Sequence, residues 1–188
     1  RDPMRADALA RRRQLIDAAT DLFCTTHPGE VTLEAVAKKA GVGIATLYRN
    51  FADREELMVE CASTALGRAV DIAHGALADF AADPAAAWEG FVRGLVDLGV
   101  GPLVPALAPA HLTELPPAVN RVRDHLASAT AELLRRAQEA GLADPSLTGA
   151  QFMAQLIVIT RPPITGVLDL DPDVTDRLVT ALLIPPAR

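Results

Sequence analysis

The residues whose side chains are best suited to recognition chemistry lie close together in the first third of the chain. They are Ala45, Thr46, Tyr48 and Arg49, which combine two small side chains with a phenol and a guanidinium group. An arginine can donate two hydrogen bonds to one guanine, and small neighbours let a helix come close to the base edges. On a helix with Leu47 inward, these four residues project outward, as base-reading side chains would. An ordinary solvated helix surface is the alternative interpretation.

Metal binding is not expected from the sulfur and imidazole groups. Cys24 and Cys61 are 37 positions apart and form no CxxC motif, so two buried free thiols are expected rather than a disulfide or a metal pair. The histidines show no HxxxH or HExxH spacing, which would place two imidazoles on one helix face. These histidines are His27, His74, His111 and His125. The sequence therefore predicts no metal site and no cofactor.

Catalysis is not expected either. The sequence contains no phosphate-binding loop and no GxGxxG or GxSxG motif. Asp124, His125 and Ser128 are an acid, a base and a nucleophile that lie close in the sequence, but neighbouring residues on a helix point in different directions. An enzyme is the least favoured class.

The composition predicts a globular protein with a substantial core. Of 188 residues, 50% are hydrophobic and 22% are charged, which fits one domain or two small subdomains. Apolar runs such as residues 156–159 are far shorter than the roughly 18 residues of a membrane helix. No apolar leader segment opens the chain, and residues 1–3 before Met4 resemble a remnant of an expression vector. We expect a soluble, cytoplasmic protein with no membrane partner.

Charge is unevenly distributed along the chain. The net charge of −6 by itself argues against a nucleic-acid partner. Residues 1–54, however, carry 9 Lys and Arg against 7 Asp and Glu, whereas residues 55–188 carry 9 against 17. Solvated helix faces would explain this pattern, but the basic surplus lies at the front, beside the phenol and guanidinium groups.

Apolar residues recur with helical spacing throughout the chain, and strand-type alternation nowhere exceeds four or five residues. The pattern predicts an all-α fold of about nine helices, with residues 99–105 interrupted by proline and glycine. The predicted helices are residues 6–25, 33–40, 43–51, 53–79, 83–98, 106–112, 117–141, 146–161 and 172–184.

The second and third of these helices have the spacing of a helix-turn-helix. Thr32 can cap the second helix, and Gly41 can adopt the left-handed conformation that ends it. The third helix is about two turns long and directs Leu47 inward. This third helix would be the second helix of the motif, which in a helix-turn-helix lies in the major groove of DNA.

One segment resembles the DNA-binding segment of the tetracycline-repressor (TetR) family of transcriptional regulators, and it reads TLEAVAKKAGVGIATLYRNFADREELMVE. The resemblance extends over about residues 11–60. It rests on the order Thr32, Ala37, Gly41-Val42, Thr46-Leu47-Tyr48, Phe51 and Glu55-Glu56-Leu57. Departures from the usual family residues are at Gly43, Asn50, Ala52 and Arg54. They bear on which operator is read.

The resemblance implies a homodimer whose two heads sit in successive major grooves of a palindromic operator and usually repress transcription. Residues 1–53 would form the helix-turn-helix DNA-binding domain, and residues 54–188 a helical domain for effector binding and dimerisation. Arg11 to Arg13, Lys38 and Arg54 would bind phosphates, with the Thr32 hydroxyl donating a further hydrogen bond. For Arg54, pairing with Glu55 or Glu56 is the alternative to phosphate binding. The DNA-binding residues predicted in this way are Thr32, Lys38, Gly43, Ala45, Thr46, Tyr48, Arg49, Asn50 and Arg54.

By the same resemblance, the last two long helices would form the dimer's four-helix bundle. Their apolar faces carry small residues at helical spacing, although intramolecular core is the alternative for each. The predicted interface residues are Ala150, Ala154, Ile157, Val158, Val174, Leu178, Ala181 and Leu182.

The helical domain would enclose a cavity for an unknown small-molecule effector. Its apolar lining candidates are Trp88, Phe91, Phe152 and Met153, and its polar candidates are His111, His125, Gln155 and Arg161. Plain core is the alternative for the aromatic residues, and surface or satisfied core is the alternative for the polar ones.

The main hypothesis is thus a ligand-responsive transcriptional repressor. A helical small-molecule-binding module with weak or lost DNA binding is the alternative, because residues 55–188 are acidic and Gly43 and Asn50 are unusual. Binding to DNA with a steep salt dependence would discriminate the two.

Overall fold

The computed structural model describes residues 3–25, 31–107, 116–161 and 166–184. Over these ranges the chain forms ten α-helices and no β-strand, which confirms the all-α prediction. The helices are α1 (Pro3–Thr25), α2 (Leu33–Lys39), α3 (Ile44–Asn50), α4 (Arg54–Asp79), α5 (Pro84–Asp97), α6 (Val100–Leu107), α7 (Pro117–Glu139), α8 (Gly149–Ile159), α9 (Val167–Leu170) and α10 (Val174–Leu183).

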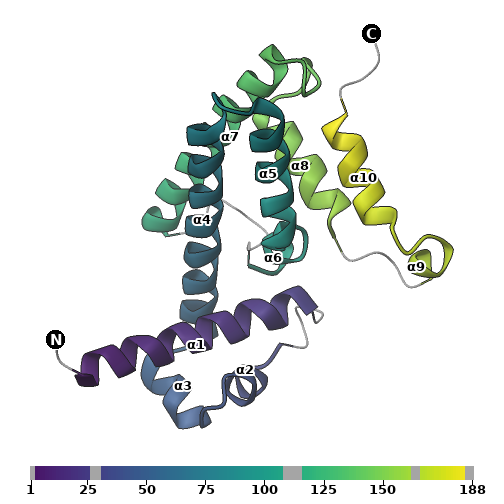
Figure 1. Ribbon diagram of the computed structural model, residues 1–188. Helices are drawn as coiled ribbons and strands as arrows, with labels where there is room; N and C mark the ends of the chain where they lie inside the picture. Colours follow the sequence, from purple (N-terminus) through teal and green to yellow (C-terminus); the bar gives the residue numbers. More distant parts are fainter. Residues whose placement is uncertain (1–2, 26–30, 108–115, 162–165, 185–188) are drawn as a thin grey trace.

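The helices form two regions (Figure 1). We call α1 to α3 with the first turns of α4 the head, and the rest of α4 with α5 to α10 the body. In the head, α1 lies across the lower end of the molecule, with α2 and α3 beneath it. From there α4 rises into the body, where it packs mainly against α7 and α5. The helix α10 lies beside α8 and α5, and α9 projects at the edge of the body.

Two hydrophobic clusters follow this division in the main, and α4 contributes to both, as do α6 through Leu103 and α7 through Val119 in the head cluster. The first turns of α4 place Leu57 and Cys61 in the head cluster, whereas Ala69 and Ala73 belong to the body cluster. A continuous helix therefore connects the two cores, so a displacement at one end has a direct route to the other.

Side-chain caps explain where several helices begin. Asp53 accepts a hydrogen bond from the backbone N–H of Glu56 (2.8 Å), and Asp83 accepts one from that of Ala86 (3.0 Å). Both starts agree with the prediction. The start of α8 was predicted near residue 146, but a capping box formed by Thr148 and Gln151 begins this helix at Gly149.

The main difference from the predicted helices lies between α5 and α7. Gly99 adopts φ +81°, which ends α5, and its carbonyl oxygen accepts a hydrogen bond from the N–H of Leu103 (3.0 Å) to begin α6. Pro102 is in the first turn of α6, where a missing N–H costs no helical hydrogen bond. The prediction that residues 99–105 are broken was therefore wrong. Beyond residue 107, the helix predicted at 106–112 lies outside the described residues.

A second difference is α9, four residues long, which the apolar pattern did not predict. It follows Gly166, whose φ of +90° is a left-handed conformation that suits glycine. A single turn of helix carries too little periodicity to be recognised from sequence. None of the described helices is long and apolar enough to cross a membrane.

Candidate nucleic-acid interface and cavity

The helix-turn-helix is built from local contacts. Thr32 accepts a hydrogen bond from the backbone N–H of Ala35 (3.1 Å) and caps α2. At the other end of α2, Gly41 takes φ +69°, and the N–H of Val42 donates to the carbonyl oxygen of Ala37 (3.0 Å) to close the turn. These bonds set the direction in which α3 leaves the turn.

One face of α3 is buried and the other is exposed. Leu47 is fully buried in the head cluster, whereas Ala45, Tyr48 and Arg49 are exposed, as the spacing predicted. Tyr48 is 52% exposed, a large fraction for an aromatic ring. The Arg49 Nε donates to the carbonyl oxygen of Ala45 (3.1 Å), which holds the Arg49 side chain against the preceding turn of α3.

The other predicted DNA-binding residues differ in their surroundings. Thr32, Lys38 and Gly43 are exposed, and Thr46 is half-buried. Because the Thr32 Oγ1 accepts its helix-capping bond, the hydroxyl proton remains able to donate to a phosphate. Asn50 is half-buried, and its Nδ2 donates to the carbonyl oxygen of Thr46 (2.8 Å).

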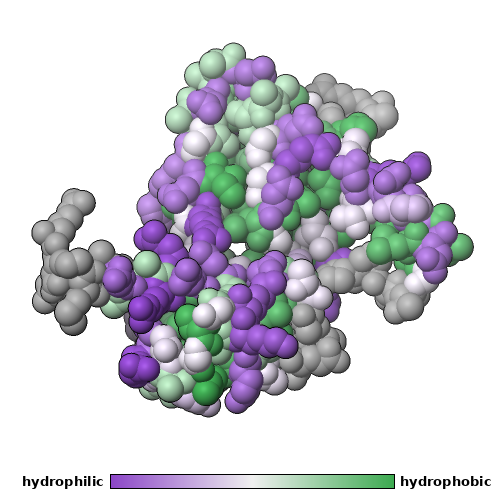
Figure 2. All heavy atoms as spheres, turned by 60° about the horizontal axis from the view of Figure 1, so that its bottom comes forward, coloured by the Kyte–Doolittle hydropathy of each residue, from purple (hydrophilic) through white to green (hydrophobic). Residues whose placement is uncertain are grey.

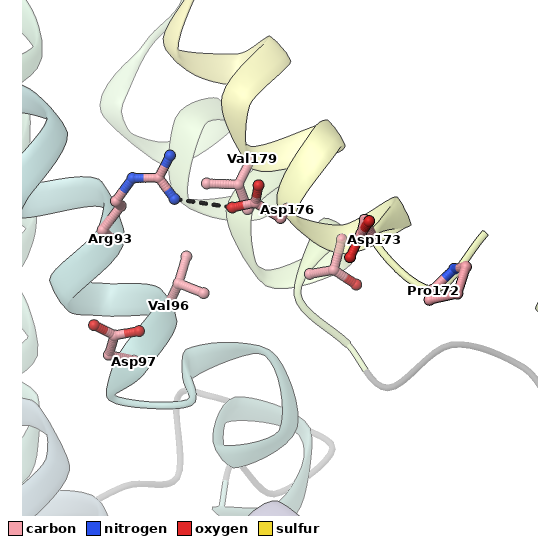
Figure 3. A pocket seen from close by; sticks show the side chains of 8 residues that line it. Arg93, Val96, Asp97, Pro172, Asp173, Asp176 and Val179 are labelled. Atoms are coloured by element: carbon pink, nitrogen blue, oxygen red, sulfur yellow. Dashed lines mark hydrogen bonds and ion pairs between the residues drawn. The ribbon is translucent and has the colours of Figure 1, made fainter. Parts of the chain in front are cut away.

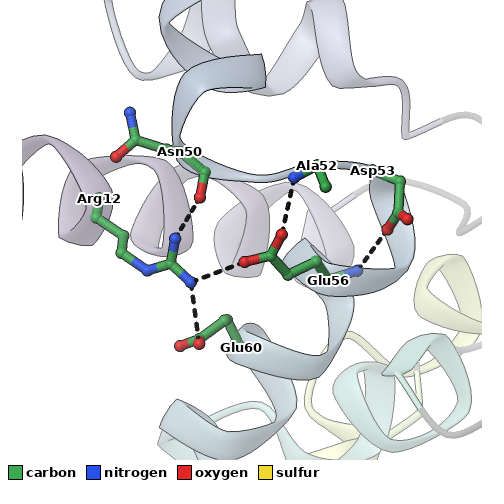
Figure 4. A network of polar contacts seen from close by, with 6 residues as sticks. All are labelled: Arg12, Asn50, Ala52, Asp53, Glu56 and Glu60. Atoms are coloured by element: carbon green, nitrogen blue, oxygen red, sulfur yellow. Dashed lines mark hydrogen bonds and ion pairs between the residues drawn. The ribbon is translucent and has the colours of Figure 1, made fainter.

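Arg12 takes part in a network inside the head instead of facing outward (Figure 4). Its guanidinium donates to the carbonyl oxygen of Asn50 and to the carboxylates of Glu56 (3.2 Å) and Glu60 (3.0 Å), and it lies 4.3 Å from the centroid of the Phe51 ring. Arg12, which was predicted to bind phosphate, therefore connects α1 with α3 and α4. Its neighbours Arg11 and Arg13 are exposed.

The same network holds Glu56 in its charged form. The backbone N–H of Ala52 donates to the Glu56 carboxylate (2.8 Å), and with the Arg12 bond this lowers the pKa of Glu56 below its ordinary value. Glu56 therefore serves both the loop after α3 and the contact with α1.

Arg54 is also engaged within the head. Its guanidinium donates to the carbonyl oxygen of Val31 and lies 5.9 Å from the centroid of the Phe23 ring. The structure thus gives Arg54 a carbonyl partner in the segment before α2. The alternative considered from sequence was a carboxylate of Glu55 or Glu56.

The body contains a cavity of about 470 Å³ between α4, α6, α7 and α8. Apolar side chains line most of it, and the polar side chains in its described lining are Thr130 and Arg123. Apolar lining residues include Ala65, Leu66, Ala69, Leu126, Ala131, Ala150, Met153 and Ile157. A hollow of this size with few polar groups has the properties of a small-molecule site.

The aromatic residues that were predicted to line a cavity pack in the core instead. Met153, which was predicted with them, does line the cavity. The rings of Trp88 and Phe152 lie 5.1 Å apart, those of Trp88 and Phe91 5.9 Å, and all three side chains are buried in the body cluster. Large rings fill the space between α5 and α8, so the hollow forms where small residues face one another. The spacing of Ala62, Ala65 and Ala69 on one face of α4 is the sequence signal that could have located it.

The three polar candidates that the structure describes do not line this cavity. His125 is exposed, and its ring lies 5.1 Å from that of His74. Gln155 and Arg161 are exposed as well, and His111 lies outside the described residues. Ser128 donates to the backbone carbonyl oxygen of Asp124 (3.0 Å), so the side chains of the trio Asp124, His125 and Ser128 have separate contacts.

A second, polar hollow of about 340 Å³ lies between α5 and α10 (Figure 3). The Arg93 Nη1 is 2.9 Å from the Asp176 Oδ1 across it, and the carboxylates of Asp97 and Asp173 stand nearby. This ion pair, which the sequence did not predict, ties α10 to the body.

The predicted dimer residues on α8 and α10 are only partly on the outer surface, because Ala150 and Ile157 also line the cavity and Leu182 packs against the body cluster. Val158 is 67% exposed and Leu178 is 46% exposed, and they lie on the adjacent helices α8 and α10. Ala150, Ala154 and Ala181 are exposed, whereas Ile157, Val174 and Leu182 are half-buried. In Figure 2 a hydrophobic patch also covers α9 at the edge of the body.

The cysteines are free thiols, but Cys24, which was expected to be buried, is only half-buried. Cys61 is buried, and this burial raises its pKa to about 11, so it is protonated at neutral pH. Among the described residues, no group of three or more His, Cys, Asp or Glu is placed to hold a metal ion.

Two family models match the chain. One is described as bacterial regulatory proteins of the tetR family and matches residues 15–61. The other is described as the C-terminal domain of SbtR-like transcriptional regulators and matches residues 83–183, more than half of the chain. The two matches fall on the head with the start of α4 and on the body.

Relatives and solved structures agree with these matches. The HTH-type transcriptional regulator SAB2452 of Staphylococcus aureus is 35% identical over 54 residues, which make up 29% of this chain and 29% of that protein. The TetR regulatory protein of Mycobacterium vanbaalenii is 28% identical, with a TM-score of 0.63 over 97% of this chain and 100% of that chain. The regulator SCO0520 of Streptomyces coelicolor is 27% identical, with a TM-score of 0.64 over 94% and 99%. The protein belongs to the TetR family of transcriptional regulators.

Proposed function

We propose that this protein is a ligand-responsive repressor that binds a palindromic DNA operator as a homodimer in the cytoplasm and is released by a small molecule. The observation that carries the proposal is the exposed face of α3. Tyr48 and Arg49 project from a two-turn helix whose opposite face is anchored by Leu47. This is the arrangement that brings a recognition helix into a major groove.

The alternative of a module that has lost DNA binding is not favoured. The turn between α2 and α3 is closed by backbone hydrogen bonds from the N–H groups of Gly41 and Val42, and α3 forms as a regular helix from Ile44 to Asn50. The unusual residues Gly43 and Asn50 are better explained by a different operator sequence.

A homodimer follows from the small size of the reading surface. A helix of seven residues offers few base contacts, whereas a twofold dimer doubles them and spaces them by about 34 Å, one turn of the duplex, or somewhat more. The exposed apolar residues Val158 and Leu178 on adjacent helices are where we place the second subunit.

Release by a ligand would use α4. Ala65 and Ala69 on this helix line the cavity, and Leu57 on the same helix is buried in the head cluster. A shift of α4 at the cavity would change the distance between the two heads, and the duplex accepts only a narrow range of distances. A ligand that favours the shifted state by about 3 kcal/mol would weaken operator binding roughly 150-fold.

The test is selection of bound duplexes from a random DNA pool, followed by affinity measurements on the recovered sequence. We expect a palindrome and a steep loss of affinity with rising salt concentration. Arg49→Ala and Tyr48→Ala should each weaken binding to the recovered sequence, because a good base contact contributes about 1–3 kcal/mol and a dimer loses two. Arg121→Ala, which removes an exposed arginine of the body, is the control and should bind normally. Recovery of no preferred sequence, or full affinity in both head variants, would refute the proposal.

A further inference from the structure

One buried hydroxyl group in the cavity wall has no hydrogen-bond partner among the described residues. Thr130 on α7 is only 1% exposed, lines the cavity, and its Oγ1 is the unpartnered atom. Two other hydroxyl groups near the cavity helices donate to the preceding turn: that of Thr160 to the carbonyl oxygen of Leu156 (2.7 Å) and that of Ser128 to the carbonyl oxygen of Asp124 (3.0 Å). Leaving a buried hydroxyl unpaired is unfavourable. Because the Thr130 Oγ1 is itself almost fully enclosed, a ligand in the adjoining cavity would pair with it after a small local shift of the cavity wall.

The walls around Thr130 offer apolar contact and little else. Leu66 comes from α4, Leu126 from α7, and Met153 and Ile157 from α8. Methionine adapts its shape readily, which suits a wall that must close around a ligand. The cavity volume of about 470 Å³ is within the range of small-molecule sites.

Charge near the cavity does not favour an ionic ligand. The guanidinium of Arg123 lies at the cavity but is only 3.2 Å from the Asp124 carboxylate, and its side chain is partly exposed. Its charge is therefore paired with a carboxylate and partly solvated at the rim of the cavity. A carboxylate entering the apolar interior would lose its hydration without gaining an uncompensated cation.

We infer that the cavity binds a neutral, mainly apolar molecule that carries one hydrogen-bonding oxygen, and that this oxygen pairs with the Thr130 hydroxyl. A threonine hydroxyl both donates and accepts, so the ligand group is an alcohol, a phenol or a carbonyl. The inference rests on the proposed function and specifies the chemistry of its effector.

Three probes of one shape test this chemistry on the full chain. They are 2-naphthol, 2-methylnaphthalene and 2-naphthoate, which place a hydroxyl, a methyl or a carboxylate on the same ring system. Their affinities are measured by displacement of the fluorescent apolar dye N-phenyl-1-naphthylamine. We expect 2-naphthol to bind about five- to tenfold more tightly than 2-methylnaphthalene, since one net hydrogen bond separates them. The carboxylate should bind most weakly.

The matched variants are Thr130→Val and Ser128→Ala. Thr130→Val keeps the shape of the side chain and removes the hydroxyl, so it should abolish the preference for 2-naphthol and leave the affinity of 2-methylnaphthalene unchanged or higher. Ser128→Ala removes an exposed hydroxyl from the same helix, one that bonds to the carbonyl oxygen of Asp124, and should change neither affinity. Thr130→Val should also unfold at the same or a higher temperature than the unaltered chain, because it loses an unpaired buried group.

Several outcomes would overturn the inference. They are equal binding of the hydroxyl and methyl probes, tightest binding of the carboxylate, equal effects of Thr130→Val on both neutral probes, a clear fall in its unfolding temperature, or no binding of any probe. The proposed function fails separately, when the unaltered chain selects no DNA sequence. Either result can occur without the other.

Discussion

The head and the body carry their functional groups in opposite ways. In the head, the groups are polar side chains such as Tyr48 and Arg49 on the outer face of a short helix, whose turn is closed by local hydrogen bonds and whose inner face packs in the head cluster. In the body, the functional feature is a space between α4, α6, α7 and α8, which come together from distant parts of the sequence. The sequence of one short helix largely determines which side chains a DNA duplex would meet, whereas a cavity depends on the packing of the whole domain.

The two regions share α4, and the chain contains a natural reporter for each. Trp88, the single tryptophan, is buried in the body cluster, whereas Tyr48, the single tyrosine, is on the head. Tryptophan fluorescence therefore follows unfolding of the body alone. Amide hydrogen exchange on α2 and α3 follows the head.

The first prediction, which has the largest expected effect, is that DNA binding by the head requires a dimer formed through the body. Leu178→Glu places a charge in the proposed dimer interface, where it would be buried and unpaired. Because Leu178 is 46% exposed in the single chain, we expect a folded monomer whose operator affinity falls at least about 100-fold. Sedimentation and DNA titration measure the two effects.

The control for this change is Ala78→Glu, which adds the same charge at an exposed position on α4. It should remain dimeric and bind DNA normally. An intact Leu178→Glu dimer would remove α10 from the interface and leave the dimer to other surfaces.

The second prediction concerns the close approach of α6 and α8, which shapes the cavity. A Cβ at Gly101 would lie 2.3 Å from the backbone carbonyl of Thr160, and backbone atoms cannot move aside as a flexible side chain can. Gly101→Ala should therefore destabilise the body by about 1–3 kcal/mol, or more if the helices cannot separate. Urea unfolding followed by Trp88 fluorescence measures this.

Gly90→Ala is its control, because a Cβ at Gly90 on α5 meets no atom within 4 Å. This change should stabilise the body by up to about 1 kcal/mol through helix propensity. Equal stabilities of the two variants would mean that α6 and α8 are not held at this distance in solution.

The same division explains what could be predicted from the sequence. The helix-turn-helix, the inward Leu47 and the outward Tyr48 follow from spacing and a glycine at the turn, which are local properties. The cavity lining did not follow, since the sequence marks Trp88 and Phe152 as conspicuous while the hollow lies among alanines that face one another. The path of α6 was missed because Pro102 reads as a helix breaker unless the start of the helix is known.

Arg12 shows a limit of another kind. Its place in a basic run suggested phosphate binding, and only the packing of α1 on α4 brings it to Glu56 and Glu60. A charge pattern gives the number of basic groups on a segment. It does not tell which of them turn inward.

The third prediction tests this inward role in the head. Arg12→Met keeps an apolar stem against Phe51 but removes the bonds to Asn50, Glu56 and Glu60. Since Arg12 is partly exposed, we expect a loss of about 1 kcal/mol in head stability, with faster hydrogen exchange in α3. Arg13→Met, at an exposed position, should leave hydrogen exchange unchanged. If both variants exchange alike, the network does not hold the head to α4.

The smallest expected effect is a pH dependence confined to the head. The pKa of Glu56 is lowered in the folded chain, first by the Ala52 N–H and then by Arg12, so the folded state binds the proton less readily than the unfolded state. Its contribution to stability is therefore complete above the ordinary glutamate value of 4.5 and is lost as pH falls below it. Glu56→Gln can still accept the Ala52 bond but has no charge to lose, so its head should show a weaker acid dependence than that of the unaltered chain. Hydrogen exchange of α3 between pH 5 and about pH 3 measures the difference, with Glu55→Gln, an exposed neighbour, as the control. Because Glu56 is in the head, the acid dependence of Trp88 fluorescence should be the same in all three proteins, and a change there would mean that the two regions unfold as one unit.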